Sequence, residues 1–316
     1  MIIVSIAGIK KELQTQLIHN HPDVDFRFYK KMNEAEKDLP VADAIITYGE
    51  NLTAENIQSA NHLKWIMVIS AGVERLPFQA IKEKNILVTN ARGIHKIPMA
   101  EYTFAAILQW CKKMKQWTVN QDKRIWSKYG LEMNELAGQT MTVVGTGAIG
   151  GEIARLAKAF RVHTLGVNRS GRKVEYFDEI YTISEIERPL TCSDIVVSVL
   201  PYTPETDHLI GKKQFDAMKE DSLFINIGRG NTVDQAELLS VLQSRKISAV
   251  LDVFEQEPLP EDHPFWGMEN VVVTPHFSSI SSLYQPRAFD IFEKNLLLFK
   301  ENRTDLINLV DLDRGY

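Results

Sequence analysis

Residues 140–168 read TMTVVGTGAIGGEIARLAKAFRVHTLGVN, and this stretch decides the fold around it. An apolar run at 140–144 predicts a strand, residues 145–150 a glycine-rich turn, the following residues to Phe160 a helix, and the run ending at Asn168 a second strand. Gly145 permits the tight turn, Gly147 leaves room for a pyrophosphate, and Gly150 lets the helix pack close to the sheet. The helix N-terminus adds free N–H groups and a positive dipole. The sequence therefore predicts a dinucleotide-binding turn made by Gly145, Thr146, Gly147, Ala148, Ile149 and Gly150.

The residue at the position that would contact the ribose indicates which dinucleotide is preferred. A site selective for NAD places Asp or Glu about 20 residues beyond the glycines. Here Asn168 stands at that place, and the residues that follow it include Arg169, Ser170, Arg172 and Lys173. A carboxylate would repel a 2′-phosphate, whereas guanidinium, hydroxyl and ammonium groups would bind it. We therefore predict that Asn168, Arg169 and Ser170 bind NADP in preference to NAD; the alternative is a solvated basic turn.

Composition excludes several other classes of protein. A chain of 316 residues with 44% hydrophobic and 24% charged residues is ordinary for a soluble globular protein of two domains. The net charge of −5 gives no electrostatic reason to expect nucleic acid or an anionic membrane as a partner. Two cysteines, Cys111 and Cys192, imply no disulfide framework and a reducing, cytoplasmic location. We expect no signal peptide, membrane span or metal site, because no apolar run, Cys spacing or His spacing indicates one.

Apolar runs alternate with helical patterns along the whole chain. This alternation predicts an α/β fold with two doubly wound parallel-sheet domains. The expected strands lie near residues 2–6, 25–29, 44–47, 65–69, 86–89, 141–144, 163–167, 195–199, 223–227, 249–252 and 271–274. Helix starts are expected at Asp234 with Glu237 and at Ser184 with Glu187, which have the spacing of N-caps.

Two long helices are expected to join the domains. One runs from Pro98 to about Trp117 and crosses from the first sheet to the second. The other has Pro286 in its first turn and returns to the first domain. The predicted domains are therefore a discontinuous one, 1–96 with 285–316, and a dinucleotide-binding one, 97–284.

Three strands of the second domain lead to residues whose side chains could take part in catalysis. Ligands of parallel sheets bind beyond the carboxyl ends of the strands. The run at 223–227 leads to Gly228, Arg229 and Gly230, and the run at 249–252 ends in Asp252, followed by Glu255 and Glu257. The run at 271–274 leads to His276. A guanidinium can stabilise developing negative charge, and an imidazole beside a carboxylate can transfer a proton.

Taken as an ordered set, these motifs resemble the D-isomer-specific 2-hydroxyacid dehydrogenase family, particularly its glyoxylate/hydroxypyruvate reductases. The resemblance extends over nearly the whole chain and implies a flavodoxin-like substrate domain beside a Rossmann cofactor domain. The matching segments are 144–150, 200–206, 226–230, 251–258, 274–276 and 308–311, with weaker matches at 70–73 and 89–93.

The resemblance also implies roles for individual residues. Arg229 would bind the carboxylate and carbonyl of the substrate, His276 would be the general acid/base, and Glu257 would be its partner, with Glu255 as an ordinary rival. Asp252 would contact the nicotinamide carboxamide or serve as a cap. Backbone amides of Ser70, Ala71, Gly72 and Val73 would bind the substrate carboxylate. Further cofactor contacts are expected at Leu200, Pro201, Thr206, Ile227 and Gly228.

These expectations lead to one main reading and two alternatives. The main reading is an oxidoreductase that uses NADPH to reduce a small 2-oxo acid, such as glyoxylate or hydroxypyruvate, to the D-2-hydroxy acid. The family also includes corepressor-like proteins that use the same fold to sense dinucleotides. A phosphoglycerate dehydrogenase would need an additional phosphate site and often has a regulatory C-terminal domain. We expect the chain to end too early for that domain. By the same resemblance, Trp126 lies at the contact of a homodimer.

Overall fold

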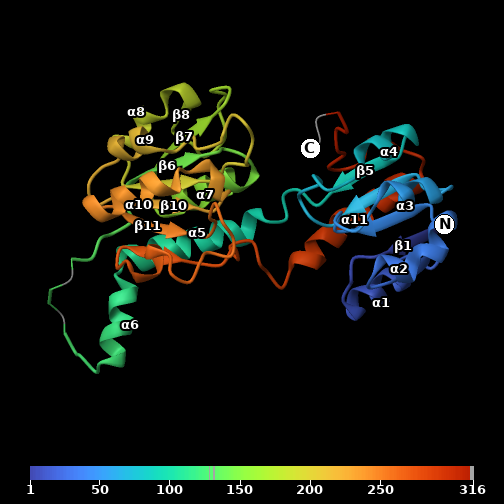
Figure 1. Cartoon of the computed structure of the whole chain (residues 1–316), viewed down its shortest axis with the longest axis horizontal. Coiled ribbons are helices and arrows are strands. Elements are labelled where there is room, and N and C mark those ends of the chain that lie inside the picture. Colours follow the sequence, from blue (N-terminus) through green and yellow to red (C-terminus); the bar gives the residue numbers. More distant parts are fainter. Residues whose placement is uncertain (128, 131, 314–316) are drawn as a thin grey trace. The chain divides into compact units, whose positions relative to one another are not determined.

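The computed structural model describes residues 1–127, 129–130 and 132–313. It divides the chain into two compact units (Figure 1). The first unit comprises Met1–Ile94 with Ser281–Tyr316, and the second comprises His95–Ile280. The division thus lies at 94/95 and 280/281, where the sequence suggested 96/97 and 284/285.

The first unit is built on a five-stranded parallel sheet. Its order, β2-β1-β3-β4-β5, is the flavodoxin-like arrangement. The strands are β1 (Ile2–Ser5), β2 (Asp25–Phe28), β3 (Ala44–Thr47), β4 (Trp65–Val68) and β5 (Leu87–Asn90). The helices are α1 (Lys11–Asn20), α2 (Met32–Ala35), α3 (Ala54–Ser59), α4 (Phe78–Glu83) and α11 (Tyr284–Lys300), with a 3-10 helix at Glu36–Val41.

Both faces of this first sheet are buried, because neighbouring residues of a strand point to opposite faces. Ile45 of β3 lies in one core with Ile57 of α3 and Ile81 of α4. The next residue, Ile46, lies in the other core with Phe292 of α11. In Figure 1 α11, in red, lies within the same unit as the blue elements from the start of the chain. The terminal helix therefore completes the first core, as predicted.

The second unit is built on a seven-stranded parallel sheet in the order β12-β11-β10-β9-β6-β7-β8. Read outward from β6, this is the Rossmann order with one further strand. The strands are β6 (Thr140–Val144), β7 (His163–Asn168), β8 (Glu179–Thr182), β9 (Ile195–Ser198), β10 (Leu223–Asn226), β11 (Ser248–Leu251) and β12 (Val271–Val273). The helices are α5 (Lys96–Cys111), α6 (Met114–Asp122), α7 (Ala148–Ala159), α8 (Glu187–Leu190), α9 (Lys212–Ala217) and α10 (Gln235–Ser244), with 3-10 helices at Ile183–Glu185, Gly230–Thr232 and Pro264–Gly267.

Helices cover both faces of the second sheet as well. Val196 of β9 belongs to the core that also contains residues of α8, α9 and α10. Its neighbours Ile195 and Val197 belong to the opposite core, which is shared with α5 and α7. Two parallel sheets, each buried on both faces, confirm the predicted α/β architecture.

Three local predictions were wrong. The helix predicted at 98–117 is two helices, because Lys113 adopts a left-handed φ of 53° between α5 and α6. Strand β8 was not predicted; its residues are half-buried or exposed, so it lacks a continuous apolar run. The cap near 184 is made by Thr182 with Glu185 and not by Ser184 with Glu187. By contrast, Asp234 does accept a hydrogen bond from the backbone N–H of Glu237, as predicted.

Among the described residues, none of the helices combines the length and the apolar character needed to cross a lipid bilayer.

Candidate functional site

The carboxyl ends of the parallel strands share one edge of the second sheet. The strand order reverses between β6 and its neighbour β9, and open parallel sheets bind ligands at such a point. The glycine-rich turn follows β6 at this edge, and β10, β11 and β12 lie on the β9 side of it. Arg229, Glu257 and His276 follow these three strands in turn, so the fold brings their loops to the same edge.

The glycine-rich turn has the shape that the sequence predicts. Gly145 has a φ of +108°, a conformation that side chains rarely adopt. A Cβ at Gly150 would lie 2.0 Å from the carbonyl oxygen of Gly145, so the helix approaches the strand too closely for any side chain. A Cβ at Gly147, in contrast, would meet nothing within 4 Å. Since α7 begins at Ala148, Gly147 leaves open space directly before the first amides of a helix, which fits a dinucleotide pyrophosphate.

Asn168 organises the basic turn that follows β7. Its side-chain amide donates to the Thr146 hydroxyl at 3.0 Å and to the carbonyl of Arg172 at 3.1 Å. Its side-chain oxygen accepts from the backbone N–H of Ser170 at 3.1 Å. These bonds tie the turn to the glycine-rich loop through Thr146. Arg169 is exposed on the turn.

Arg169 has an acidic neighbour on the loop after β9. The pKa of the Glu205 carboxyl is lowered mainly by its hydrogen bond with Thr203, and the charge of Arg169 contributes. This loop carries the predicted cofactor residues Leu200, Pro201 and Thr206. The Thr206 hydroxyl donates to the carbonyl of Pro201 at 2.7 Å and accepts from the backbone N–H of Thr203 at 2.8 Å, which holds the loop closed on itself.

Arg229 projects between two glycines that the surrounding backbone requires. A Cβ at Gly228 would lie 2.5 Å from the carbonyl oxygen of Leu200, and one at Gly230 would lie 1.9 Å from the carbonyl carbon of Phe254. Neither position can therefore carry a side chain, while Arg229 between them is exposed. Its guanidinium donates to the carbonyl of Gly228 at 2.9 Å. Ile227 is buried beneath this loop.

His276 and Glu257 form a close pair. The Nδ1 atom of His276 lies 2.8 Å from Oε2 of Glu257, and the side chains are 42% and 37% exposed. The other oxygen of Glu257 accepts from the backbone N–H of Phe254 at 3.0 Å. An ionised carboxylate only accepts, so Nδ1 is the donor and Nε2 is the ring nitrogen left to exchange a proton. Glu255, the alternative from the sequence, pairs instead with His208 at 3.2 Å.

Asp252 holds the loop on which His276 lies. Its side chain is completely buried. Oδ1 accepts from the Thr274 hydroxyl at 2.6 Å and from the backbone N–H of Phe277 at 3.0 Å, and Oδ2 accepts from the backbone N–H of Ser278 at 3.0 Å. The carboxylate thus caps the loop, which was one of the two roles that the sequence suggested. The role in binding the nicotinamide carboxamide stays a prediction.

Two residues at this edge were missed by the sequence analysis. His95, just before α5, hydrogen-bonds the backbone of Ser279; burial lowers its pKa, this hydrogen bond opposes the shift, and the charge of Arg229 adds to it. His95 therefore lies near both Arg229 and the loop of His276. Tyr102, on α5, hydrogen-bonds Thr274. No local pattern could have revealed the second contact, because 172 positions separate the partners.

The predicted carboxylate-binding loop belongs to the first unit. Ser70, Ala71, Gly72 and Val73 follow β4 at the carboxyl edge of that sheet. The Ser70 hydroxyl donates to the carbonyl of Gly72 at 3.0 Å, and the Asn90 side chain donates to the carbonyl of Ala71 at 2.8 Å. These two hydrogen bonds hold the loop through its carbonyl groups and use none of its backbone amides.

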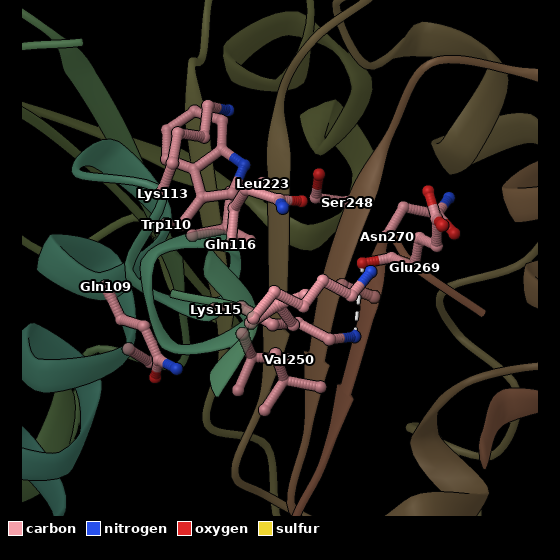
Figure 2. Close-up of a pocket in the computed structure, with 15 residues that line it drawn as sticks. Gln109, Trp110, Lys113, Lys115, Gln116, Leu223, Ser248, Val250, Glu269 and Asn270 are labelled. Carbon is pink, nitrogen blue, oxygen red and sulfur yellow. Dashed lines mark hydrogen bonds between the residues drawn. The ribbon is translucent and has the colours of Figure 1, made fainter. Parts of the chain in front are cut away.

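A separate groove lies on the second unit, away from the carboxyl edge (Figure 2). Its volume is about 400 Å³, and its lining comes from the end of α5, from α6 and from the beginnings of β10, β11 and β12. Figure 2 shows Lys115 reaching across it, where the ammonium donates to the carbonyls of Glu269 and Val271 at 3.2 and 3.1 Å. None of the predicted site residues lines this groove.

Comparisons of sequence and of structure with known proteins point to the same family. A family model described as D-isomer specific 2-hydroxyacid dehydrogenase, NAD binding domain, matches residues 104–278. The chain is 31% identical to a glyoxylate reductase of Korarchaeum cryptofilum, over 86% of this chain and 82% of that protein. The solved structure of a D-isomer specific 2-hydroxyacid dehydrogenase family protein from Aeromonas salmonicida matches with a TM-score of 0.86 and 33% identity, over 99% of both chains.

A longer relative is equally similar in sequence. The chain is 31% identical to a D-3-phosphoglycerate dehydrogenase of Archaeoglobus fulgidus, over 88% of this chain and 53% of that protein. The chain therefore spans about half the length of this relative. The names of these relatives differ in substrate, so they leave the substrate of this chain open.

Two glycine variants separate folding from ligand binding. Gly230→Ala should lower the free energy of unfolding by about 3 kcal/mol or more, because its Cβ would overlap backbone that cannot move aside. Gly147→Ala should cost less than about 1 kcal/mol, since its Cβ meets open space. The same methyl group should weaken dinucleotide binding by roughly tenfold, about 1.4 kcal/mol. Thermal unfolding and calorimetric titration measure the two effects; equal destabilisation by both variants would contradict the account.

Proposed function

Because the chain belongs to the D-isomer specific 2-hydroxyacid dehydrogenase family, we propose that it reduces a small 2-oxo acid to the D-2-hydroxy acid with NADPH. The observation that carries this proposal is the His276–Glu257 pair, at 2.8 Å, on the edge that also presents Arg229. Glyoxylate and hydroxypyruvate are the proposed substrates, because the relatives include the glyoxylate reductase of Korarchaeum cryptofilum and a hydroxypyruvate reductase of Thermotoga maritima.

Each group in the pair has a defined part in the reaction. A nicotinamide dinucleotide held by residues 145–150 would supply a hydride to the carbonyl carbon, and the carbonyl oxygen would then need a proton. Protonated His276 donates from Nε2 to that oxygen, because Nδ1 is held by Glu257. The carboxylate of Glu257 orients the imidazole, and it is itself held by a second bond from the backbone N–H of Phe254. Oxidation of the hydroxy acid runs the same proton transfer in reverse.

Arg229 supplies the fixed positive charge for the substrate. A guanidinium has five N–H donors in a planar fork and binds carboxylates with two parallel bonds. One donor of the Arg229 guanidinium is used by the carbonyl of Gly228, and this bond holds the guanidinium beside its own loop. We propose that the remaining donors bind the substrate carboxylate and carbonyl oxygen. The amides of Ser70, Ala71, Gly72 and Val73 in the first unit are also proposed, from the resemblance, as substrate-binding groups.

The cofactor is proposed to lie along the predicted binding residues. Gly145, Thr146, Gly147, Ala148, Ile149 and Gly150 would bind the pyrophosphate, and Leu200, Pro201, Thr206, Ile227 and Gly228 would lie along the rest of the dinucleotide. Contact of Asp252 with the carboxamide is proposed from the resemblance alone, since the structure shows this side chain completely buried.

The test of this function is a panel of 2-oxo acids offered with NADPH and NADH. We expect turnover with glyoxylate or hydroxypyruvate. His276→Gln should lower kcat by about 10²–10⁴, because glutamine cannot transfer the proton. Loss of the absorbance of the reduced nicotinamide measures turnover. Preference for a phosphorylated 2-oxo acid would favour the phosphoglycerate dehydrogenase alternative, and dinucleotide binding without any turnover would favour the corepressor-like one.

NADP preference is proposed from the basic turn. Asn168 replaces the carboxylate that would repel a 2′-phosphate, and its bonds to Ser170 and Arg172 shape the turn on which Arg169 is exposed. Arg169→Ala should raise the Michaelis constant for NADPH by about 10- to 100-fold, since a charge-assisted hydrogen bond contributes about 1.5–3 kcal/mol. The constant for NADH should change little.

The control for this variant is Arg188→Ala. Arg188, on α8, is an exposed guanidinium of the same unit and pairs with Glu185 of the preceding 3-10 helix, so its loss changes the net charge equally without touching the turn. Equal effects of Arg169→Ala on both dinucleotides would contradict the assignment.

We also propose a homodimer that uses α6 and the residues after it. Figure 1 shows α6 projecting from the body of the second unit. Trp126 is 93% exposed, and further apolar side chains nearby are exposed at Met114, Val119, Ile125, Tyr129 and Met133. A concentration of exposed apolar surface marks a protein interface. Light scattering should give twice the 36.0 kDa chain mass, and Trp126→Asp should give the monomer; a monomeric wild type would contradict the proposal.

A cytoplasmic location is proposed from the cysteines. Cys111 is buried and Cys192 is exposed, and both are free thiols. Free thiols persist in reducing compartments. A disulfide detected by mass spectrometry in the native protein would contradict this location.

A further inference from the structure

The loop of His276 has an unusual backbone that something must hold. His276 has a left-handed φ of 51°, which is uncommon for a residue other than glycine. Its backbone N–H donates to the carbonyl of Asp252 at 2.8 Å, and Asp252 also binds Phe277 and Ser278 through its carboxylate. Such conformations persist only where the surroundings fix them. The groups that fix this loop therefore decide where the imidazole lies.

Tyr102 of α5 reaches this loop at two points. Its hydroxyl lies 2.7 Å from Oγ1 of Thr274, two positions before His276. Its ring meets the ring of Phe277, one position after His276, with centroids 5.6 Å apart and planes at 86°. This edge-to-face geometry is a favourable one for aromatic pairs. A single side chain thus contacts the loop on both sides of the imidazole.

The direction of the hydrogen bonds follows from the chemistry of the three groups. The Thr274 hydroxyl has one proton, and it is donated to the Asp252 carboxylate at 2.6 Å, because an ionised carboxylate only accepts. The Tyr102 hydroxyl must therefore donate to Thr274. Burial raises the pKa of Tyr102 to about 12, the bond with Thr274 opposes this, and the charge of Asp252 adds to it. The phenol accordingly keeps its proton throughout the working range of the enzyme.

We propose that Tyr102 is a positioning residue for His276, which it holds through Thr274 and Phe277. It completes the chain Tyr102–Thr274–Asp252, in which α5 is bonded to the buried carboxylate that fixes the loop. Tyr102 contacts neither substrate nor cofactor in this role. Its effect on catalysis rests on the proposed function of His276, whereas its effect on the loop does not.

Two variants of Tyr102 separate its two contacts. Tyr102→Phe keeps the ring beside Phe277 and removes the hydrogen bond, so kcat should fall by about tenfold. Tyr102→Leu removes both contacts, and kcat should fall on the order of a hundredfold, the size of effect expected when a catalytic group is displaced by about 1 Å. The Michaelis constant for NADPH should stay unchanged in both. Tyr181→Phe is the matched control, because it removes a hydroxyl whose partner is Glu179 on the edge strand of the same unit.

A second measurement needs no catalysis. Hydrogen–deuterium exchange in the protein without ligands should become faster at the amides of residues 276–278 in Tyr102→Phe, and faster still in Tyr102→Leu. Exchange in the other strands of the unit should stay unchanged, which shows that the fold is retained. Wild-type kcat together with wild-type exchange in Tyr102→Leu would overturn the proposal.

The two measurements also keep the two proposals apart. If the wild type turns over no 2-oxo acid, the proposed function fails while the exchange experiment still tests the hold of Tyr102 on the loop. If the wild type is active and Tyr102→Leu lowers kcat with unchanged exchange at 276–278, the positioning role is refuted and the function stands.

Discussion

The buried carboxylate of Asp252 is the group on which the geometry of the edge depends. A charge without exposure to water is very unfavourable unless hydrogen bonds replace its hydration. Here the replacement comes from Thr274, Phe277 and Ser278, which all belong to one short loop. The loop cannot move without leaving the carboxylate unsatisfied, so the left-handed backbone of His276 is held by the same free energy that stabilises the buried charge. The hydrogen bonds that stabilise the buried carboxylate therefore also fix the orientation of the imidazole.

Close backbone packing decides which side chains the edge can present. Around β9 and β10, Gly228 lies against the backbone of Leu200 and Gly230 against that of Phe254, so these positions exclude side chains. Arg229 is the residue between them, and its guanidinium is consequently the group that extends from this loop. The glycine-rich turn after β6 works differently, because Gly147 leaves space empty instead of being required by a neighbour. The same residue type therefore serves packing at one loop and ligand access at another.

The sequence was most informative where one residue type had a single physical use. Buried strands appear in the sequence as apolar runs, and the glycines at 145, 147 and 150 predict the turn. It failed where the outcome depended on groups distant along the chain. The half-exposed strand β8 has no apolar run, and the break at Lys113 follows no Gly or Pro. The choice of Glu257 over Glu255 depended on the resemblance and on the adjacent Pro258, because in the structure it is decided by which carboxylate the folded loop turns toward His276.

Helix α5 and its N-cap carry two side chains that contact the loop of His276. His95, at its N-cap, and Tyr102, within it, are seven positions apart, which places them on one face of a helix, about two turns from each other. His95 bonds the backbone of Ser279, and Tyr102 bonds Thr274 and packs on Phe277. The helix therefore contacts the loop on both sides of His276. Burial and the charge of Arg229 keep His95 toward its neutral form, so it adds no positive charge to compete with Arg229 for an anionic substrate. Because the chain enters the second unit at His95, the first helix of that unit is the one that contacts the loop of His276.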